Sequence, residues 1–338
     1  MLRCIELAKN GLGTTAPNPS VGCVIVHNQQ IIGEGYTSPY GGNHAEVNAI
    51  NSVKDKSLLP KSTLYVSLEP CAHFGKTPPC ADLVCSTKIK RVVIGCVDSN
   101  SKVNGAGIKK LMEGGIDVVI GKLEEECRES NKRFFTFHEK KRPYIILKWA
   151  ETADGFVDHI RPSNEVPALA ITCDSSNVLV HKWRTQEQAI MVGKNTVMLD
   201  NPTLTARLYA GTNPVRIIID SKLEIDTKTS VFSDDASTII FNTKRSEKNG
   251  NTELIRVNNT DNLKEMLTEL FNRDIQSVIL EGGPKLHNSF YQAGLWDEIR
   301  RFVSPTSIHT GVPALNLDIE PIGSSLIGTD ELYSYSNR

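Results

Sequence analysis

The sequence lacks a long uninterrupted apolar run. Its first nine residues mix charged and apolar side chains, and no later segment reaches the roughly 18 apolar residues that a membrane-spanning helix needs. We therefore expect a cytoplasmic location and no membrane partner.

Neither sign of charge dominates the chain. Lys and Arg number 38 and Asp and Glu number 39, which gives a formal net charge of -1. A chain without a basic surplus has no strong field to attract a polyanion, so we expect no nucleic-acid partner. With 39% apolar and 23% charged residues, the composition is typical of a globular protein.

Two structural devices are also missing. The eight cysteines are spread along a chain that is large enough to fold without cross-links, so we expect no disulfide framework. The sequence has no fixed-period repeat either, which excludes a solenoid.

What the 338 residues do contain is the pattern of two α/β domains. In the first, apolar spacing predicts a helix over 2–10, paired strands over 21–26 and 30–36, a helix over 44–53, and strands over 63–68, 91–97 and 116–120. Because helical stretches separate the last three strands, we expect those strands to be parallel.

A polar run over 138–143 marks the domain boundary, since Pro143 stops any helix that arrives from 122–137. We assign a first domain to 1–139 and a second to 144–338. The second domain is again α/β, with strands predicted over 144–148, 189–193, 215–220, 237–241 and 277–281, and a helix over 261–272.

The first domain carries a candidate catalytic zinc site. His44 opens a predicted helix, and Cys71 and Cys80 follow a predicted strand, so one imidazole and two thiolates leave a fourth position open for water. Glu46, two residues beyond the histidine, suits proton transfer without being a ligand.

Each part of this pattern has a plainer interpretation when it stands alone. An isolated His-x-Glu is usually a solvated helix start, and two cysteines nine positions apart are usually unrelated. The combination, in the order helix, strand, Pro-Cys, favours one Zn²⁺ per chain and a deaminase.

These residues resemble the cytidine deaminase superfamily. That family's general pattern has two residues between the cysteines, whereas this chain has eight. The segments 69–80 and 16–22 look like the riboflavin-pathway deaminases, which have a three-layer cytidine-deaminase-like fold. The resemblance implies substrate contacts by Asn18, His73 and Lys76. A turn at Asn18 and a solvated cation at Lys76 are the alternatives.

The second domain lacks the Gly-x-Gly-x-x-Gly signature of a dinucleotide-binding Rossmann fold. Its ordered motifs at 147–155, 181–184, 192–196, 200–207 and 281–283 instead resemble the reductase domain of the bifunctional riboflavin enzymes. The resemblance implies a dihydrofolate-reductase-like fold, NADPH as cofactor, and a homo-oligomer formed through this domain. It also implies a small phosphoribosyl-pyrimidine as the substrate.

Several residues of the second domain are candidate ligands. Arg184 and Arg207 suit a ribose phosphate because guanidinium groups pair bidentately with phosphate oxygens, although surface solvation is the alternative. Lys148 and Glu281 suit polar contacts to substrate, and Gly282 and Gly283 let backbone N–H groups approach a cofactor phosphate, unless they form only a tight turn. By resemblance Leu204 lies on the substrate side, and the NADP side comprises Ala150, Thr196, Asp200 and Ser221.

Two further points concern the cofactor. The family usually has a Ser-x-Trp before Ile171-Thr172, and this chain has residues 167–170, Pro-Ala-Leu-Ala, in its place, which leaves the efficiency of reduction open. The basic turn after the strand over 237–241 suggests that Lys244 or Arg245, with Thr243, contacts the 2′-phosphate of NADPH.

The resemblance implies hydrolytic deamination of 2,5-diamino-6-(5-phosphoribosylamino)pyrimidin-4(3H)-one, followed by NADPH-dependent reduction of the ribosyl group to ribityl. One alternative is a tRNA or nucleotide deaminase with an accessory domain. A second is a non-catalytic protein stabilised by zinc, which would close the metal with a fourth Cys or His.

Overall fold

The structure is a computed structural model that describes residues 1–74, 78–99 and 104–337. The chain divides into two compact units, Met1–Lys141 and Arg142–Arg338. The division falls within the polar segment 138–143. In the described ranges, no helix is both long enough and apolar enough to cross a membrane.

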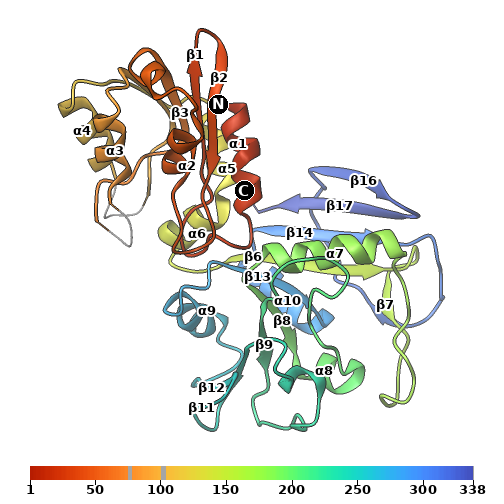
Figure 1. The fold of residues 1–338 in the computed structure, drawn as a ribbon. Coiled ribbons are helices and arrows are strands. Elements are labelled where there is room, and N and C mark those ends of the chain that lie inside the picture. The colour runs from red at the N-terminus through yellow and green to blue at the C-terminus, as the bar shows by residue number, and fades with distance from the viewer. Residues whose placement is uncertain (75–77, 100–103, 338) are drawn as a thin grey trace. The chain divides into compact units, whose positions relative to one another are not determined.

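The first unit alternates helices and strands (Figure 1). Its elements are α1 (Leu2–Ala8), η1 (Lys9–Gly11), β1 (Gly22–His27), β2 (Gln30–Tyr36), α2 (Ala45–Ser52), η2 (Lys56–Lys61), β3 (Thr63–Leu68), α3 (Cys80–Ser86), β4 (Arg91–Cys96), α4 (Ala106–Glu113), β5 (Asp117–Ile120), α5 (Glu124–Ser130) and α6 (Lys132–Lys140).

Its five strands form one sheet in the order β2-β1-β3-β4-β5. β1 pairs antiparallel with β2 and β3, whereas β3, β4 and β5 are parallel, as predicted. Side chains alternate between the faces of a strand. Ile25 therefore packs with Ala49 of α2, and its neighbour Val24 packs with Leu7 of α1.

Helices cover both faces of this sheet. Figure 1 shows α3 and α4 on one side and α1 and α5 on the other. The helix α1 approaches so closely that a Cβ at Gly22 would lie 1.9 Å from the carbonyl oxygen of Cys4. The predicted three-layer α/β fold is confirmed.

The second unit contains the remaining elements. They are β6 (Tyr144–Glu151), β7 (Phe156–Asp158), α7 (Asp174–Gln186), β8 (Ala189–Gly193), α8 (Lys194–Asp200), β9 (Val215–Ile219), η3 (Ser230–Phe232), β10 (Thr238–Asn242), β11 (Glu247–Asn249), β12 (Thr252–Arg256), α9 (Leu263–Phe271), β13 (Ser277–Gly282), α10 (Pro284–Gln292), β14 (Glu298–Val303), β15 (Val312–Pro313), β16 (Gly323–Ile327) and β17 (Asp330–Ser336).

Ten of these strands form one sheet, in the order β11-β12-β10-β9-β8-β13-β6-β14-β17-β16. The pairs from β12 through β14 are parallel, and the strands at both edges are antiparallel to their neighbours. The central strands are mainly apolar because both faces of the sheet are covered. Leu147 packs on the side of α9 and α10, and the adjacent Ile146 packs on the side of α7.

Candidate functional sites

A cluster of three metal-binding side chains lies at the carboxyl end of β3. His44 immediately precedes α2, Cys71 follows β3, and Cys80 is the first residue of α3. The Nδ1 atom of His44 lies 3.5 Å from Sγ of Cys71 and 3.3 Å from Sγ of Cys80. The three donor atoms lie within 4.8 Å of one another, so this set fits a tetrahedral zinc ion with one open position.

The electrostatics of the cluster suit a metal site. A hydrogen bond from the Cys80 thiol lowers the pKa of Cys71 well below its ordinary value. Burial opposes this shift, and a hydrogen bond from His44 adds to it. The pair therefore supplies a thiolate, the form of cysteine that binds metals. The backbone N–H of Cys80 also donates to Sγ of Cys71, at 3.3 Å.

Glu46 is the acidic residue of this site. It lies in the first turn of α2 and is 4% exposed. Burial, and secondly the charge of Cys71, raise its pKa to about 7. A carboxyl group with a pKa near neutrality can both accept and donate a proton at the same pH, as general acid and base catalysis requires.

The predicted substrate contacts of this unit are less well defined. Asn18 is half-buried, and its backbone N–H closes a turn onto the carbonyl of Thr15 at 2.9 Å. His73 is exposed, two residues beyond Cys71. Lys76 lies outside the described residues. The roles of all three stay predictions.

A buried charge cluster joins β6, α7 and β13 in the second unit. Arg184 donates two parallel hydrogen bonds to Glu281, from Nε to Oε1 at 2.8 Å and from Nη2 to Oε2 at 2.7 Å. The ammonium of Lys148 lies 3.9 Å from Oε2 of the same carboxylate. Burial lowers the pKa of Lys148, against the attraction of Glu281.

The carboxylate is the centre of this cluster. Burial raises the pKa of Glu281, but the charges of Arg184 and Lys148 outweigh burial and bring that pKa to about 2. Glu281 therefore stays ionised and holds two cations in place. The structure thus brings together three predicted substrate-binding residues from distant parts of the chain.

The geometry modifies the role expected for Arg184. The Nε and Nη2 atoms of its guanidinium group already donate to Glu281, and Nη1 donates to the carbonyl of Thr205 at 2.9 Å. Arg207 is exposed, with Nη1 3.3 Å from Oγ1 of Thr203, and so keeps donors for an anion. Leu204 is 3% exposed and belongs to the core on the α7 side.

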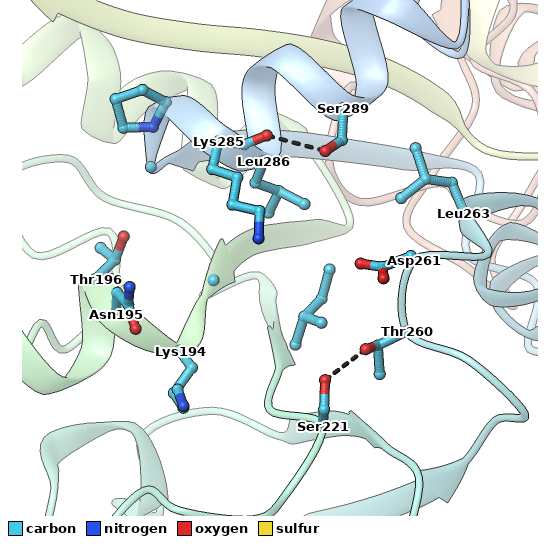
Figure 2. Close-up of a pocket in the computed structure, with 14 residues that line it drawn as sticks. Lys194, Asn195, Thr196, Ser221, Thr260, Asp261, Leu263, Lys285, Leu286 and Ser289 are labelled. Carbon is cyan, nitrogen blue, oxygen red and sulfur yellow. Dashed lines mark hydrogen bonds between the residues drawn. The ribbon is translucent and has the colours of Figure 1, made fainter. Parts of the chain in front are cut away.

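A cavity of about 330 Å³ lies where β8, β9 and β13 end (Figure 2). Its walls include the start of α8, the end of β9, the segment before α9 and the start of α10. Three predicted cofactor residues line it, namely Thr196, Ser221 and Gly283. Figure 2 shows Ser221 hydrogen-bonded to Thr260, and Lys285 reaching toward the open space.

The other predicted cofactor residues are not among those lining this cavity. Gly282 is near it, since a Cβ there would lie 3.4 Å from Oγ1 of Thr196. Ala150 packs against the core on the α7 side, and Asp200 forms an ion pair with Arg161. Residues 167–170, where the family's Ser-x-Trp is missing, form neither helix nor strand.

The expectation that Lys244 or Arg245 contacts the 2′-phosphate of NADPH stays a prediction. Neither residue lines the cavity of Thr196 and Ser221. Arg245 lines a separate cavity of about 470 Å³ and pairs with Glu247 at 2.8 Å. The hydroxyl of Thr243 donates to the carbonyl of Ser221 at 2.9 Å. The turn is thus tied to the backbone of Ser221, and Arg245 lines the other cavity.

The two cavities are separated by the end of β9. Ile219 and Ser221 line the cavity of Thr196, whereas Asp220 between them lines the cavity of Arg245. This division follows from the alternation of side chains along an extended chain.

Sequence reasoning gave no role to several residues that the structure places at these sites. They are Glu69 beside the metal cluster, His181 near Arg184, and Lys194, Thr260, Asp261 and Lys285 at the cavity. Pro284 at the first position of α10 is a helix-start signal that could have drawn attention to Lys285. Thr260 and Asp261 carry no comparable signal, because only the folded sheet brings their loop to the end of β9.

Comparison with protein families divides the chain in the same way. Residues 1–96 match the cytidine and deoxycytidylate deaminase zinc-binding region, and residues 143–311 match the RibD C-terminal domain.

Individual relatives match over nearly the whole chain. The riboflavin biosynthesis protein RibD of Aquifex aeolicus is 39% identical over 335 residues, which cover 96% of this chain and 92% of that protein. RibD of Escherichia coli is 34% identical over 90% of this chain and 86% of its own length.

Solved structures agree with the family match. The diaminohydroxyphosphoribosylaminopyrimidine deaminase/5-amino-6-(5-phosphoribosylamino)uracil reductase of Thermotoga maritima superposes with a TM-score of 0.89, at 37% identity, over 99% of this chain and 96% of that one. Acinetobacter baumannii RibD gives a TM-score of 0.87 at 31% identity, over 98% of this chain and 96% of that one. With a deaminase zinc-binding region, a RibD C-terminal domain and full-length relatives of this kind, the chain belongs to the RibD family of riboflavin biosynthesis proteins.

Proposed function

We propose that this enzyme of riboflavin biosynthesis catalyses two successive reactions, one in each unit. Residues 1–139 deaminate 2,5-diamino-6-(5-phosphoribosylamino)pyrimidin-4(3H)-one, and residues 144–338 reduce the ribosyl group of the product to ribityl. The observation that carries the proposal is the convergence of His44, Cys71 and Cys80 beside the buried Glu46.

In the deaminase site, His44, Cys71 and Cys80 would hold the zinc ion. Zinc supplies Lewis-acid activation of water at neutral pH. Glu46 takes a proton from that water at its carboxylate and passes a proton to the leaving amine, a transfer for which its pKa of about 7 is suited. Asn18, His73 and Lys76 are the proposed contacts to the phosphoribosyl pyrimidine.

In the reductase site, the cavity of Thr196, Ser221 and Gly283 would hold NADPH. The backbone at the start of α10 offers N–H groups to an anion, and Lys285 adds a cation there. NADPH supplies the hydride. Ala150, Asp200 and Gly282 remain proposed cofactor contacts on the family resemblance alone.

The Lys148–Glu281–Arg184 cluster lies next to that cavity, because Glu281 is only two residues from Gly283. Lys148 offers N–H donors at Nζ to the ribosyl oxygens, while Glu281 fixes the position of Nζ. Arg207 is the proposed contact to the substrate phosphate, and Leu204 and Arg184 shape the wall behind it.

The alternative of a tRNA deaminase with an accessory domain is not favoured, because the second half matches the RibD C-terminal domain. We also propose a cytoplasmic location and a homo-oligomer formed through the reductase unit. Both proposals come from the sequence resemblance.

The decisive experiment supplies the diaminopyrimidine phosphate to the purified chain with and without NADPH and follows both products. We expect the deaminated ribosyl compound without NADPH, and the ribityl compound with it. Release of no ammonia by the zinc-loaded chain would contradict the deaminase assignment, and failure to oxidise NADPH with the deaminated compound would contradict the reductase assignment.

A further inference from the structure

Glu69 is a buried carboxylate at the start of the loop that carries the first thiolate of the metal cluster. It follows β3 directly, is 4% exposed, and is separated from Cys71 only by Pro70. Its backbone N–H donates to the carbonyl of Cys96 at the end of β4, at 3.0 Å. The main chain at Glu69 is therefore tied to the neighbouring parallel strand just before the metal-binding loop begins.

The side chain of Glu69 accepts four backbone hydrogen bonds from a different part of the chain. Oε2 accepts from Asp98 at 3.2 Å and from Gly105 at 3.0 Å. Oε1 accepts from Gly107 at 2.9 Å and from Ile108 at 3.2 Å. One carboxylate thus binds both the segment that follows β4 and the first turn of α4. The N–H groups of that first turn have no partners within the helix, so the carboxylate satisfies them.

The contact is close on the backbone as well. A Cβ at Gly107 would lie only 1.9 Å from the carbonyl oxygen of Pro70, and 3.2 Å from Oε1 of Glu69. The first turn of α4 therefore packs against the two residues that precede Cys71. Only glycine at position 107 permits this approach.

We propose that Glu69 is a positioning residue for the metal centre, which sets the location of Cys71 by clamping its loop to the start of α4. The proposal rests on the proposed zinc site. His44 and Cys80 are held by the starts of α2 and α3. Cys71 lies on an irregular segment, where the N–H of Ala81 donates to its carbonyl at 3.1 Å and ties it to α3. The Glu69 clamp adds a second tie, to α4, on the side of the loop that precedes Cys71.

Replacing a residue that orients a metal ligand, without itself binding the metal, typically lowers metal affinity by about 10- to 100-fold. Glu69→Gln is the sharpest variant, because it keeps the size of the side chain but turns an amide N–H₂ toward two of the four N–H donors. We expect zinc affinity, measured by competition with a chelator, to fall by about that factor. We also expect the absorption bands of the cobalt-substituted protein to shift, since these bands report ligand geometry.

A second variant tests the same idea without touching the carboxylate. Gly107→Ala pushes the first turn of α4 away from Pro70. It should produce the same loss of zinc affinity and a similar spectral shift. The matched control is Glu34→Gln, which removes a charge from the same unit at a surface ion pair with Arg3 and should change neither measurement.

The outcomes distinguish a failure of the zinc site from a failure of the role proposed for Glu69. The parent chain must bind one zinc ion, and a parent that binds none overturns the metal site itself. Thermal unfolding of the same variants, followed by circular dichroism, reports whether the first unit is folded. If both variants bind zinc as tightly as the parent, with unchanged cobalt spectra, Glu69 only caps α4 and the proposal is wrong. If Glu69→Gln fails to fold, Gly107→Ala alone decides between these outcomes.

Discussion

Arg184 and Glu281 come from positions 97 residues apart in the sequence and meet as a two-point ion pair at 2.7 and 2.8 Å. Their side chains are only 12% and 7% exposed, and the ammonium of Lys148 shares the same carboxylate. The single carboxylate of Glu281 therefore balances the positive charges of both Arg184 and Lys148.

Glu281→Gln should destabilise the reductase unit and abolish reduction. Loss of one partner of a buried ion pair costs about 3–5 kcal/mol, because the other charges are left buried without compensation. Thermal unfolding and NADPH oxidation measure both effects. The control is Glu247→Gln, which breaks a pair whose side chains are 64% and 51% exposed and should cost at most about 1 kcal/mol. Equal losses for the two variants would contradict the central role of Glu281.

Glu46→Gln should leave zinc bound and slow deamination by about 10²- to 10⁴-fold, the usual contribution of a general acid or base. The amide keeps the size of the buried side chain but cannot carry the proton. Metal analysis and ammonia release measure the two properties separately. Deamination at the parent rate would rule out Glu46 as the proton carrier.

Cys80→Ser should abolish deamination while NADPH oxidation on the deaminated substrate persists. Serine is a poor zinc ligand compared with a thiolate, and the reductase residues belong to the other compact unit. Loss of both activities in a folded variant would mean that the two reactions share one site.

The structure bears on how far such sites can be predicted from sequence. The metal ligands were predictable because His44 and Cys80 stand at helix starts and Cys71 follows a strand, and because all three have donor types that zinc prefers. The α/β class followed from apolar runs such as those of β4 and β13, which the sheets bury on both faces.

Contacts that depend on tertiary structure were not predictable. Arg184 has the right chemistry for a phosphate, but the fold places Glu281 against it, and this carboxylate takes the two parallel N–H donors that a phosphate would need. Likewise, Arg245 follows a buried strand end as a cofactor contact would, yet it lines a different cavity. Glu69 begins the segment 69–80 that carries the family resemblance, but its role was not predictable, since its four donors lie 29 to 39 residues away.

Lys285→Ala should weaken NADPH binding by about 1.5 to 3 kcal/mol, the typical contribution of a hydrogen bond to a charged group. Lys285 lines the proposed cofactor cavity at the start of α10. The double variant Lys244→Ala with Arg245→Ala removes two cations that do not line that cavity and should bind NADPH like the parent. Titration of each variant with NADPH gives the comparison, and a larger effect of the double variant would reverse the assignment.

The reductase unit should lose stability as the pH falls from about 6.5 to about 4. Burial lowers the pKa of His287 from 6.5 to about 4, so in this range the unfolded chain binds the proton and the folded chain does not. The loss attributable to this fully buried group is on the order of 3 kcal/mol. His287→Gln does not titrate and should show a shallower pH dependence in urea unfolding. Parallel curves for parent and variant would show that the pKa of His287 is not lowered in the folded state.

The end of β9 has a consequence for changes in chain length. Ile219 and Ser221 face one cavity and Asp220 faces the other. A substitution at one of these positions alters one wall, but the insertion or deletion of a single residue just before Ser221 would turn that side chain away from the cavity of Thr196. A single-residue deletion there should therefore disable cofactor binding more severely than any one substitution.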